Sequence, residues 1–405
     1  MWLTVALAFP VQPASQVGPG PNILPDEEET IVKALIFLGA GKNKLEWQEK
    51  PDLIVQGDLE AIVRPIASAT CDLDREILRG HVPMSQHPGF AIGHECVAEV
   101  LEVGDKIRLH KRGDIVVVPP FISCGVCVQC RAGMHSHCTT VSPVASERVY
   151  GLPTGKKDWG GLFSEEVSVP FADGMLVPVP AGVDPVSVAS ASDNMVDAYI
   201  TVRRGLAKHP GAPTLVVGGV DSFGLFVAEQ ALAQGSARVD YYDRDPQRRA
   251  AARLLGCEVL SEMPEVDRHY PFVVFASRDN AELEPTVRAM APGGHIQLLT
   301  GFFGGPAKLN LWEMFMRDVT LAIGIPNSKT HIPAVLEQVR CGHIHPERIV
   351  TVHDWTEVPD ALSTSDIKPV IVRPTIADSS EKRSIQRGKT DASALLRSTR
   401  PTHLA

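Results

Sequence analysis

The sequence predicts an α/β protein with two parts: a β-rich part of short, mostly antiparallel strands, and a doubly wound parallel sheet covered by helices. Two observations predict this fold class. Short β-branched runs broken by Gly and Pro fill residues 31 to about 185, and a regular alternation of strand and helix follows from about residue 190. The chain has 405 residues, 44% of them hydrophobic, which is enough for a large core and for two or three globular units.

The parallel sheet is predicted from the order of its elements. Strands are expected at 214–219, 237–243, 272–277, 294–301 and 318–325, with helices at 224–235 and 245–256. The second helix has clear end signals, with Asp245 as N-cap, Pro246 in the first turn and Gly256 after the last turn.

The β-rich part is predicted from runs at 59–67, 96–104, 114–121 and 165–170, with no long amphipathic helix between them. Residues 331–374 return to mixed character and end in IKPVIVRP, which is expected to form the last strand. Residues 1–30 are predicted to be a flexible extension and residues 375–405 a disordered tail, because both are polar or Pro-rich and lack periodicity.

Charge and hydropathy narrow the possible partners. The formal net charge is -9, so the chain offers no basic face for a phosphate backbone, and a small molecule is a better expectation than nucleic acid. The apolar opening MWLTVALAF is too short to span a membrane, and no later run reaches about 18 apolar residues. A soluble, cytoplasmic protein is expected, with no membrane partner.

Four of the eight cysteines lie within 15 residues, in the pattern C-x2-C-x2-C-x7-C. Four thiolates on a tight loop are typical of the closed coordination of structural zinc. Buried thiols that cluster by chance, or a redox pair, are the alternatives. The proposed ligands are Cys124, Cys127, Cys130 and Cys138.

A second metal site, open to substrate, has three candidate ligands: Cys71, His94 and Asp193. Together they would supply a sulfur, an imidazole and a carboxylate, which neutralise Zn²⁺ and leave one position free. Taken singly, each has a simpler interpretation as a packed thiol, a core histidine or a helix cap. Their order along the chain is what favours the metal.

A dinucleotide site is indicated by a strand followed by Gly219, Asp221 and Gly224, then a helix, then Asp243 at the end of the next strand. The last glycine permits close helix packing, the helix N-terminus faces a pyrophosphate, and Asp243 can accept both ribose hydroxyls. Asp221 replaces the middle glycine. Its charge opposes a phosphate unless the side chain turns away to cap the helix at Ser222.

These motifs, in this order, resemble the medium-chain dehydrogenase/reductase family of zinc alcohol dehydrogenases over about residues 31–374. Asp193, together with the RG at 79–80 and the stretch YGLPTGKKDWGGLFSEEVSVPFAD, looks most like the formaldehyde-dehydrogenase-like branch of that family. The resemblance implies a GroES-like catalytic domain (31–190 and 331–374) with a structural zinc lobe, and a Rossmann domain (191–330). Asp193 stands where the familiar two-cysteine, one-histidine set has its second cysteine.

The resemblance also implies roles for further residues. Cys71, His94 and Asp193 would bind the catalytic zinc, with Glu95 beside it, and the chain would hold two zinc ions and NAD. Gly219, Gly224, Asp243 and Arg248 would hold the adenosine half of the cofactor, and Lys368 would reach its pyrophosphate. For Glu95 the alternative is a carboxylate paired with an arginine, and for Arg248 and Lys368 a solvated charge. A homodimer or homotetramer is expected.

Two positions depart from the family pattern. Relatives carry Ser or Thr two residues after the first zinc ligand, and often His five after it, to pass the alcohol proton to solvent. Here these positions are Leu73 and Glu76. Leu73 cannot relay a proton, so the route would use water, the ribose hydroxyl, or a carboxylate such as Asp72 or Glu76. Glu76 is interpreted first as a surface charge on a short helix.

The resulting hypothesis is hydride transfer between an alcohol or aldehyde and NAD, with zinc as the Lewis acid. NAD is expected over NADP because Asp243 would repel a 2′-phosphate, although Arg244 lies beside it. One alternative is a formaldehyde dehydrogenase or aldehyde dismutase that keeps NAD tightly bound. An alternative of another class is a catalytically silent NAD-binding regulatory protein, suggested by Leu73 and Asp221.

Overall fold

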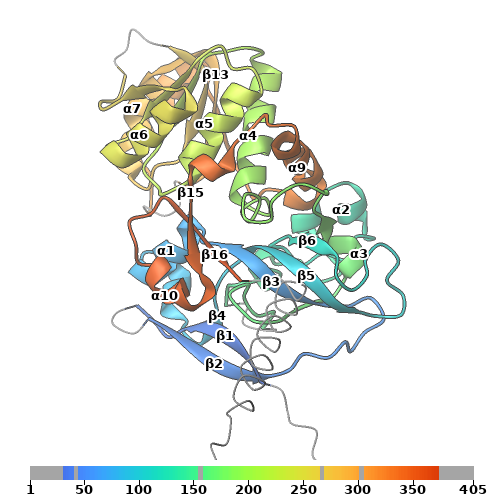
Figure 1. Ribbon diagram of the computed structural model, residues 1–405. Coiled ribbons are helices and arrows are strands. Elements are labelled where there is room, and N and C mark those ends of the chain that lie inside the picture. The colour runs from blue at the N-terminus through green and yellow to red at the C-terminus, as the bar shows by residue number, and fades with distance from the viewer. Residues whose placement is uncertain (1–30, 41–43, 154–157, 265–268, 301–304, 374–405) are drawn as a thin grey trace, which may run out of the picture.

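The computed structural model describes residues 31–40, 44–153, 158–264, 269–300 and 305–373. The extension predicted for 1–30 and the tail predicted for 375–405 lie outside these residues. Figure 1 shows two bodies, one built on antiparallel strands and one on a parallel sheet. The predicted α/β fold class, with a β-rich part and a doubly wound sheet, is confirmed.

The β-rich body contains two sheets over the described ranges, one along the path β15-β16-β3-β5-β6-β8 with β7 paired to β3, and a smaller one in the order β2-β1-β4. Apart from the parallel pair β15 and β16, neighbouring strands in both sheets run antiparallel. The strands predicted at 59–67, 96–104, 114–121 and 165–170 correspond to β3, β5, β6 and β7. The strand bounds are β1 Ile31–Phe37, β2 Leu45–Pro51, β3 Ala61–Ala69, β4 Phe90–Ala91, β5 Glu95–Val103, β6 Ile115–Val118, β7 Val167–Val169, β8 Val177–Pro178, β15 Val350–Asp354 and β16 Lys368–Val372.

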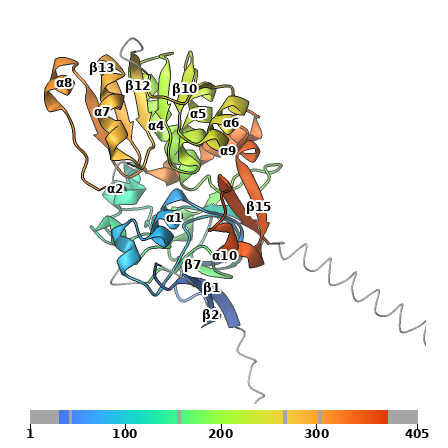
Figure 2. The same cartoon turned by 90° about the vertical axis from the view of Figure 1, so that its left-hand side faces the viewer.

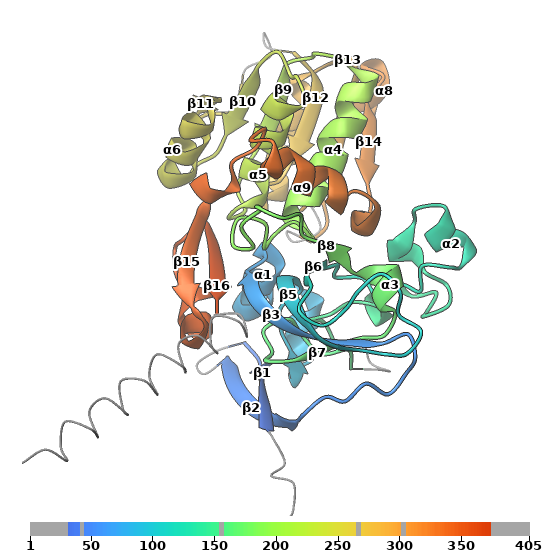
Figure 3. The same cartoon turned by 45° about the vertical axis from the view of Figure 1, so that its right-hand side comes forward.

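The helices of this body are short. The longest in its described part, α1, begins directly after β3 and lies on the side that faces the parallel sheet (Figure 3). The bounds are α1 Asp72–Arg79, α2 Val128–Arg131, α3 Ala172–Met175 and α10 Val358–Ala361.

The parallel body has a six-stranded sheet, counted over the described residues, in the order β11-β10-β9-β12-β13-β14. The order reverses between β9 and β12, and ligands of such sheets bind at the carboxyl ends of the strands at this switch point. The bounds are β9 Thr214–Val217, β10 Val239–Tyr242, β11 Glu258–Leu260, β12 Tyr270–Phe275, β13 Met290–Leu298, β14 Thr320–Ile323, α4 Asn194–Lys208, α5 Phe223–Ala233, α6 Pro246–Leu255, α7 Leu283–Arg288, α8 Leu311–Met316 and α9 Ile332–Arg340.

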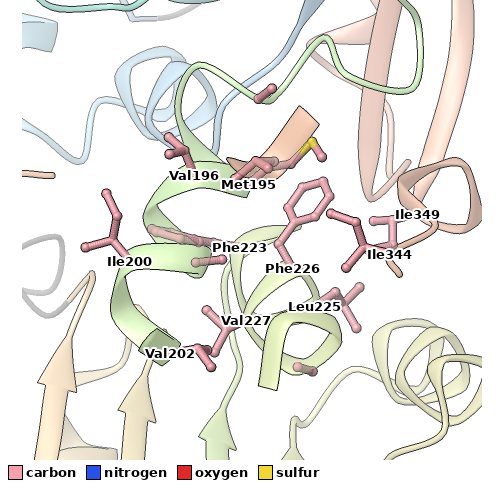
Figure 4. Close-up of a cluster of buried hydrophobic side chains, with 14 of the residues drawn as sticks. Met195, Val196, Ile200, Val202, Phe223, Leu225, Phe226, Val227, Ile344 and Ile349 are labelled. Atoms are coloured by element: carbon pink, nitrogen blue, oxygen red, sulfur yellow. The ribbon is translucent and has the colours of Figure 1, made fainter. Parts of the chain in front are cut away.

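Alternating side chains of the central strands pack on opposite faces of this sheet, as the strand period of two requires. Val216 of β9 joins the cluster that includes α4 and α5, whereas Leu215 and Val217 join the cluster that includes Leu283 of α7. Figure 2 shows helices on both sides of the sheet. Figure 4 shows how α4 and α5 pack together, with side chains such as Ile200 and Phe226 in the shared cluster.

The predicted ends of α6 are confirmed. Asp245 accepts hydrogen bonds from the backbone N–H groups of Gln247 and Arg248, Pro246 is the first residue, and Gly256 ends the helix with φ of 100°. Helix α4, which the sequence analysis did not predict, supplies much of one sheet-covering face.

Helix α9 packs against α4, and the chain then rejoins the antiparallel sheet at β15 and β16. We propose a division into a β-rich domain, built from residues 31–190 and the strands β15 and β16, and a parallel-sheet domain from residue 191 to 330 with α9 against it. Among the described residues, no helix combines the length and the apolar character needed to cross a bilayer.

Candidate active site and metal centres

Cys71, His94 and Asp193 come together where β3, β5 and α4 meet. Cys71 is the N-cap of α1, just after β3, and His94 directly precedes β5, the antiparallel partner of β3. Asp193 is the N-cap of α4. The Oδ2 atom of Asp193 lies 3.3 Å from the Sγ of Cys71 and 3.6 Å from the Nε2 of His94.

This geometry fits a zinc ion. Ligand atoms bonded to one tetrahedral Zn²⁺ at about 2.0–2.3 Å are separated from each other by roughly 3.3–3.8 Å. The three donor atoms and a carboxylate oxygen of Glu95 all lie within 4.8 Å of one another. The donor set of sulfur, nitrogen and oxygen is also the set that zinc prefers.

Asp74, which the sequence analysis did not single out, supports two of these ligands. Its Oδ2 accepts a hydrogen bond of 2.8 Å from the backbone N–H of Cys71, and its Oδ1 lies 3.3 Å from the Nδ1 of His94. A carboxylate on the second nitrogen of a metal-binding histidine fixes the ring and its tautomer. The spacing of three residues from Cys71 to Asp74, a capping-box pattern, is the signal that could have found it.

Burial and neighbouring charges shift the pKa values of the three candidate ligands. Burial, followed by the charge of Asp193, raises the pKa of the Cys71 thiol, and a bound metal cation would favour its thiolate. Burial opposes a charge on His94, but Asp74 and Cys71 outweigh it and raise its pKa. Burial likewise opposes a charge on Asp193, but His94 outweighs it and lowers the pKa of Asp193.

Glu95 and Lys368 form a buried ion pair beside this cluster. The Nζ of Lys368 lies 3.0 and 2.9 Å from the two carboxylate oxygens of Glu95, and neither side chain is exposed. Burial raises the pKa of Glu95 to about 8, although Lys368 acts against this shift. The structure thus places Lys368 next to the metal ligands, and the charge beside Glu95 is a lysine, where the sequence analysis considered an arginine.

A cavity of about 270 Å³ opens over Cys71, His94 and Asp193 and is walled by both domains. Its polar lining includes Asp197, one helical turn after Asp193, and sequence reasoning gave no reason to choose it. The apolar lining residues include Leu73, Phe121, Leu152, Phe223, Leu299 and Ile325.

The four-cysteine loop forms a second cluster away from this cavity. The sulfurs of Cys124, Cys127, Cys130 and Cys138 lie within 4.8 Å of one another, and all four are free thiols. A hydrogen bond from the backbone of Cys130 lowers the pKa of Cys127 to about 5, which favours the thiolate that binds metal. The residues fit a closed tetrahedral zinc site.

The cysteine loop also contacts the other domain. The backbone N–H of Ser136 donates to Asn327, and the hydroxyl of Thr330 donates to the carbonyl of Gly133. Pro326, beside Asn327, lines the cavity over Cys71. A metal in the loop would therefore order one wall of the cavity.

The predicted dinucleotide residues gather at the switch point of the parallel sheet. Gly219 follows β9 with φ of 135°, and a Cβ there would lie 2.8 Å from the Oγ of Ser277, so only glycine fits. Asp243 follows β10 and is fully buried. Its carboxylate accepts two hydrogen bonds from Arg248, of 2.7 and 2.9 Å, so the structure pairs these two predicted residues with each other.

Comparison with known proteins agrees with this geometry. Residues 57–181 match the family model described as the alcohol dehydrogenase GroES-like domain. The chain is 31% identical over 289 residues to the L-galactonate-5-dehydrogenase of Escherichia coli (strain K12). The match covers 69% of this chain and 79% of that relative. The chain belongs to the medium-chain, zinc-type alcohol dehydrogenase family.

Other relatives in this family include glutathione-independent formaldehyde dehydrogenases. The one from Bacillus subtilis (strain 168) is 29% identical over 56% of this chain, and the match spans only 59% of that relative's length. Among solved structures, the alcohol dehydrogenase TADH from Thermus sp. ATN1 superposes with a TM-score of 0.74 at 27% identity, covering 84% of this chain and 99% of that one. The resemblance predicted from the sequence is confirmed.

Two details of this family member differ from the sequence-based expectation. Asp221 does not cap α5; the carboxylate of Asp72 accepts from the backbone N–H groups of Ser222 and Phe223 instead, at 3.0 and 3.1 Å. Glu76 lies on a short helix as expected, but it is buried, not a surface charge, and it pairs with the guanidinium of Arg79 at 2.6 Å. Both differences arise because α1 packs against the parallel-sheet domain.

Proposed function

We propose that this chain is a zinc-dependent oxidoreductase that interconverts an alcohol and its aldehyde or ketone, with NAD as hydride carrier. One observation carries the proposal. The candidate metal ligands Cys71, His94 and Asp193 share one cavity with Phe223, the first residue of α5 after β9 at the switch point, and with Leu299, which follows β13. A hydride transfer needs a metal site and a nicotinamide site that face the same space.

Each residue has a part in this proposal. When bound, the zinc supplies a Lewis acid for the substrate oxygen, and NAD supplies the hydride acceptor. Cys71 and Asp193 contribute two negative charges, and Asp74 orients the imidazole of His94. The apolar walls, including Leu73, exclude water from the reacting groups.

We propose NAD as the preferred cofactor because Asp243 places a carboxylate at the end of β10, where it would repel a 2′-phosphate. Arg248 binds both oxygens of that carboxylate and offsets part of its charge, so the preference requires the ribose hydroxyls to replace Arg248 as partners of Asp243. Turnover measured with both cofactors tests the preference, and equal or faster turnover with NADP would contradict it.

The substitution Asp193→Asn tests the metal centre. It should remove activity and one of two zinc ions per chain while the fold is retained, because a neutral amide is a poor zinc ligand. Zinc content by atomic emission, far-UV circular dichroism and alcohol oxidation rates are the measurements. Asp105→Asn, at an exposed position, is the matched control. Full zinc content and full rate in Asp193→Asn would show that Asp193 is not a ligand.

A formaldehyde dehydrogenase or aldehyde dismutase with tightly bound NAD is the second candidate, favoured by the relatives named formaldehyde dehydrogenases. The two candidates differ in how strongly the cofactor is retained. NAD recovered from purified, undialysed protein at one equivalent per chain would select this candidate, whereas its absence would favour a dissociating cofactor.

We also propose a homo-oligomer, formed through the free edge of the parallel sheet. Within the part of the chain that the structure describes, strand β14 ends the sheet, and the neighbouring helix α8 exposes Trp312, Phe315 and Met316 at 63–75%. An unpaired edge strand beside an exposed apolar helix is typical of a subunit interface. Light scattering of the native protein and of Phe315→Ser should show an oligomer and a smaller species, respectively.

A further inference from the structure

The N-terminus of α5 already holds an anion, and this anion comes from the other domain. Asp72 of α1 accepts hydrogen bonds from the backbone N–H groups of Ser222 and Phe223, and from the Ser222 hydroxyl at 3.3 Å. The first N–H groups of a helix are where a dinucleotide fold binds the pyrophosphate. A carboxylate of this chain therefore uses donors of that cradle.

A second carboxylate, Asp221, sits among guanidinium groups at the same place. Arg75 of α1 lies 3.2 Å from its Oδ2 and Arg278, after β12, lies 3.5 Å from its Oδ1. Arg79 and Arg248 approach Asp221 at 3.7 and 3.9 Å. Four cations thus surround the position where the usual glycine of the motif would leave space for a phosphate.

Asp221 does not accept hydrogen bonds from all the donors of the two nearest guanidinium groups, those of Arg75 and Arg278. Among the residues that the structure describes, the Nε and Nη2 atoms of both Arg75 and Arg278 are buried and form no hydrogen bond. Within this described part, the Nη2 of Arg278 makes only the 3.5 Å ion-pair contact with Asp221, and its Nη1 lies 3.4 Å from Glu76. The Arg75 side chain is only 4% exposed, so water does not readily reach its donors, whereas the Arg278 side chain is 31% exposed. A phosphate offers more acceptor oxygens than a carboxylate and pairs with the guanidinium fork in a bidentate manner. The cluster matches a phosphate better than it matches Asp221.

We propose that Arg75 and Arg278 bind the pyrophosphate of the dinucleotide from opposite domains. In the absence of cofactor Asp221 occupies their binding positions, and the pyrophosphate replaces Asp221 at the arginines and Asp72 at the N–H groups of Ser222 and Phe223. This inference rests on the proposed function, because it assumes that the parallel-sheet domain binds a nicotinamide dinucleotide. Asp221 weakens cofactor binding, because binding must break its ion pairs and turn its charge away from the phosphates.

Direct binding of NADH, followed by nucleotide fluorescence, tests the exchange without reference to activity. Asp221→Gly should bind NADH at least tenfold more tightly than the native chain, and the isosteric Asp221→Asn should lie between them. Arg75→Met should bind at least tenfold more weakly, with partial recovery in Arg75→Lys, which restores the charge but not the fork. Asp184→Asn, in a different part of the chain, is the control.

Inorganic pyrophosphate provides a second probe. It should raise the melting temperature of Asp221→Gly more than that of the native chain, because the variant leaves the arginines free. Unchanged or weaker NADH binding in Asp221→Gly and Asp221→Asn, with both variants folded, would show that the cluster is only a tie between domains and would overturn the inference.

The two proposals fail in different ways. Alcohol oxidation with NAD by the native chain, together with unchanged NADH affinity in the Asp221 variants, would remove this inference and keep the proposed function. No NADH binding in any variant would remove both, even if Asp193→Asn still showed the loss of one zinc.

Discussion

The carboxylate of Asp74 should control how tightly the candidate catalytic zinc is held. It contacts two ligands at once, accepting from the backbone of Cys71 at 2.8 Å and lying 3.3 Å from the Nδ1 of His94. Loss of such a partner typically costs roughly 10- to 100-fold in metal affinity, or about 1.4–2.7 kcal/mol. Asp74→Asn keeps the size of the side chain and removes its charge, so we expect a loss within this range.

The assay is zinc release to a chromogenic chelator, followed over time and chelator concentration. The four-cysteine site serves as an internal reference, because Asp74 does not belong to that cluster. In Asp74→Asn one zinc should leave at a roughly 10- to 100-fold lower chelator concentration while the other leaves as in the native chain. If both ions left as they do from the native chain, Asp74 would not be what holds His94, and our account of the site would be wrong.

Two further predictions concern stability. Burial, followed by the charge of Lys208, lowers the pKa of His295 to about 4. In the unfolded chain the pKa of His295 is about 6.5, so acid protonates the unfolded chain first. His295 should therefore lower the free energy of unfolding by about 2 kcal/mol as the pH falls from about 7.5 to about 5. Urea unfolding at several pH values should show a smaller loss of stability with acid in His295→Gln than in the native chain. An equal loss in both would exclude His295 as its source. Gly205→Ala should lower the unfolding free energy by about 1–2 kcal/mol despite a better helix propensity, because the added Cβ would lie 2.1 Å from the Phe272 ring. Gly57→Ala, where a Cβ meets no atom, is its control, and equal stability of the two variants would contradict the prediction.

The parts of the site that were predictable depend on local pattern and strand order. Cys71 and His94 flank β3 and β5, and an antiparallel pairing of these neighbours brings the two residues to one end of the sheet. The cap of α6 was predictable because Asp245, Pro246 and Gly256 act within one helix. In both cases the residues that matter are close in sequence or joined by one strand pairing.

The parts that were not predictable depend on how the two domains meet. Helix α1 alone gives no sign that Glu76 is buried, since its partner Arg278 comes from the parallel-sheet domain. Asp221 could have capped its own helix, and it does not because Asp72 reaches the same N–H groups from the opposite side. Asp197 becomes a cavity residue only once α4, unpredicted from sequence, packs against the metal ligands.

Helix α1 joins the metal site to the cofactor loop through residues that are adjacent in sequence. Cys71 at its N-cap belongs to the candidate zinc site, and Asp72, the next residue, bonds to the N-terminus of α5. Leu73, one residue further, lines the cavity together with Phe223 of α5. Because eight residues of regular helix move as a rigid unit, a shift of α5 against the β-rich domain must either break the Asp72 contacts or carry Cys71 with it. If the exchange of Asp221 for a phosphate shifts α5 while the Asp72 contacts are intact, these contacts would carry that shift to Cys71 through the first turn of α1.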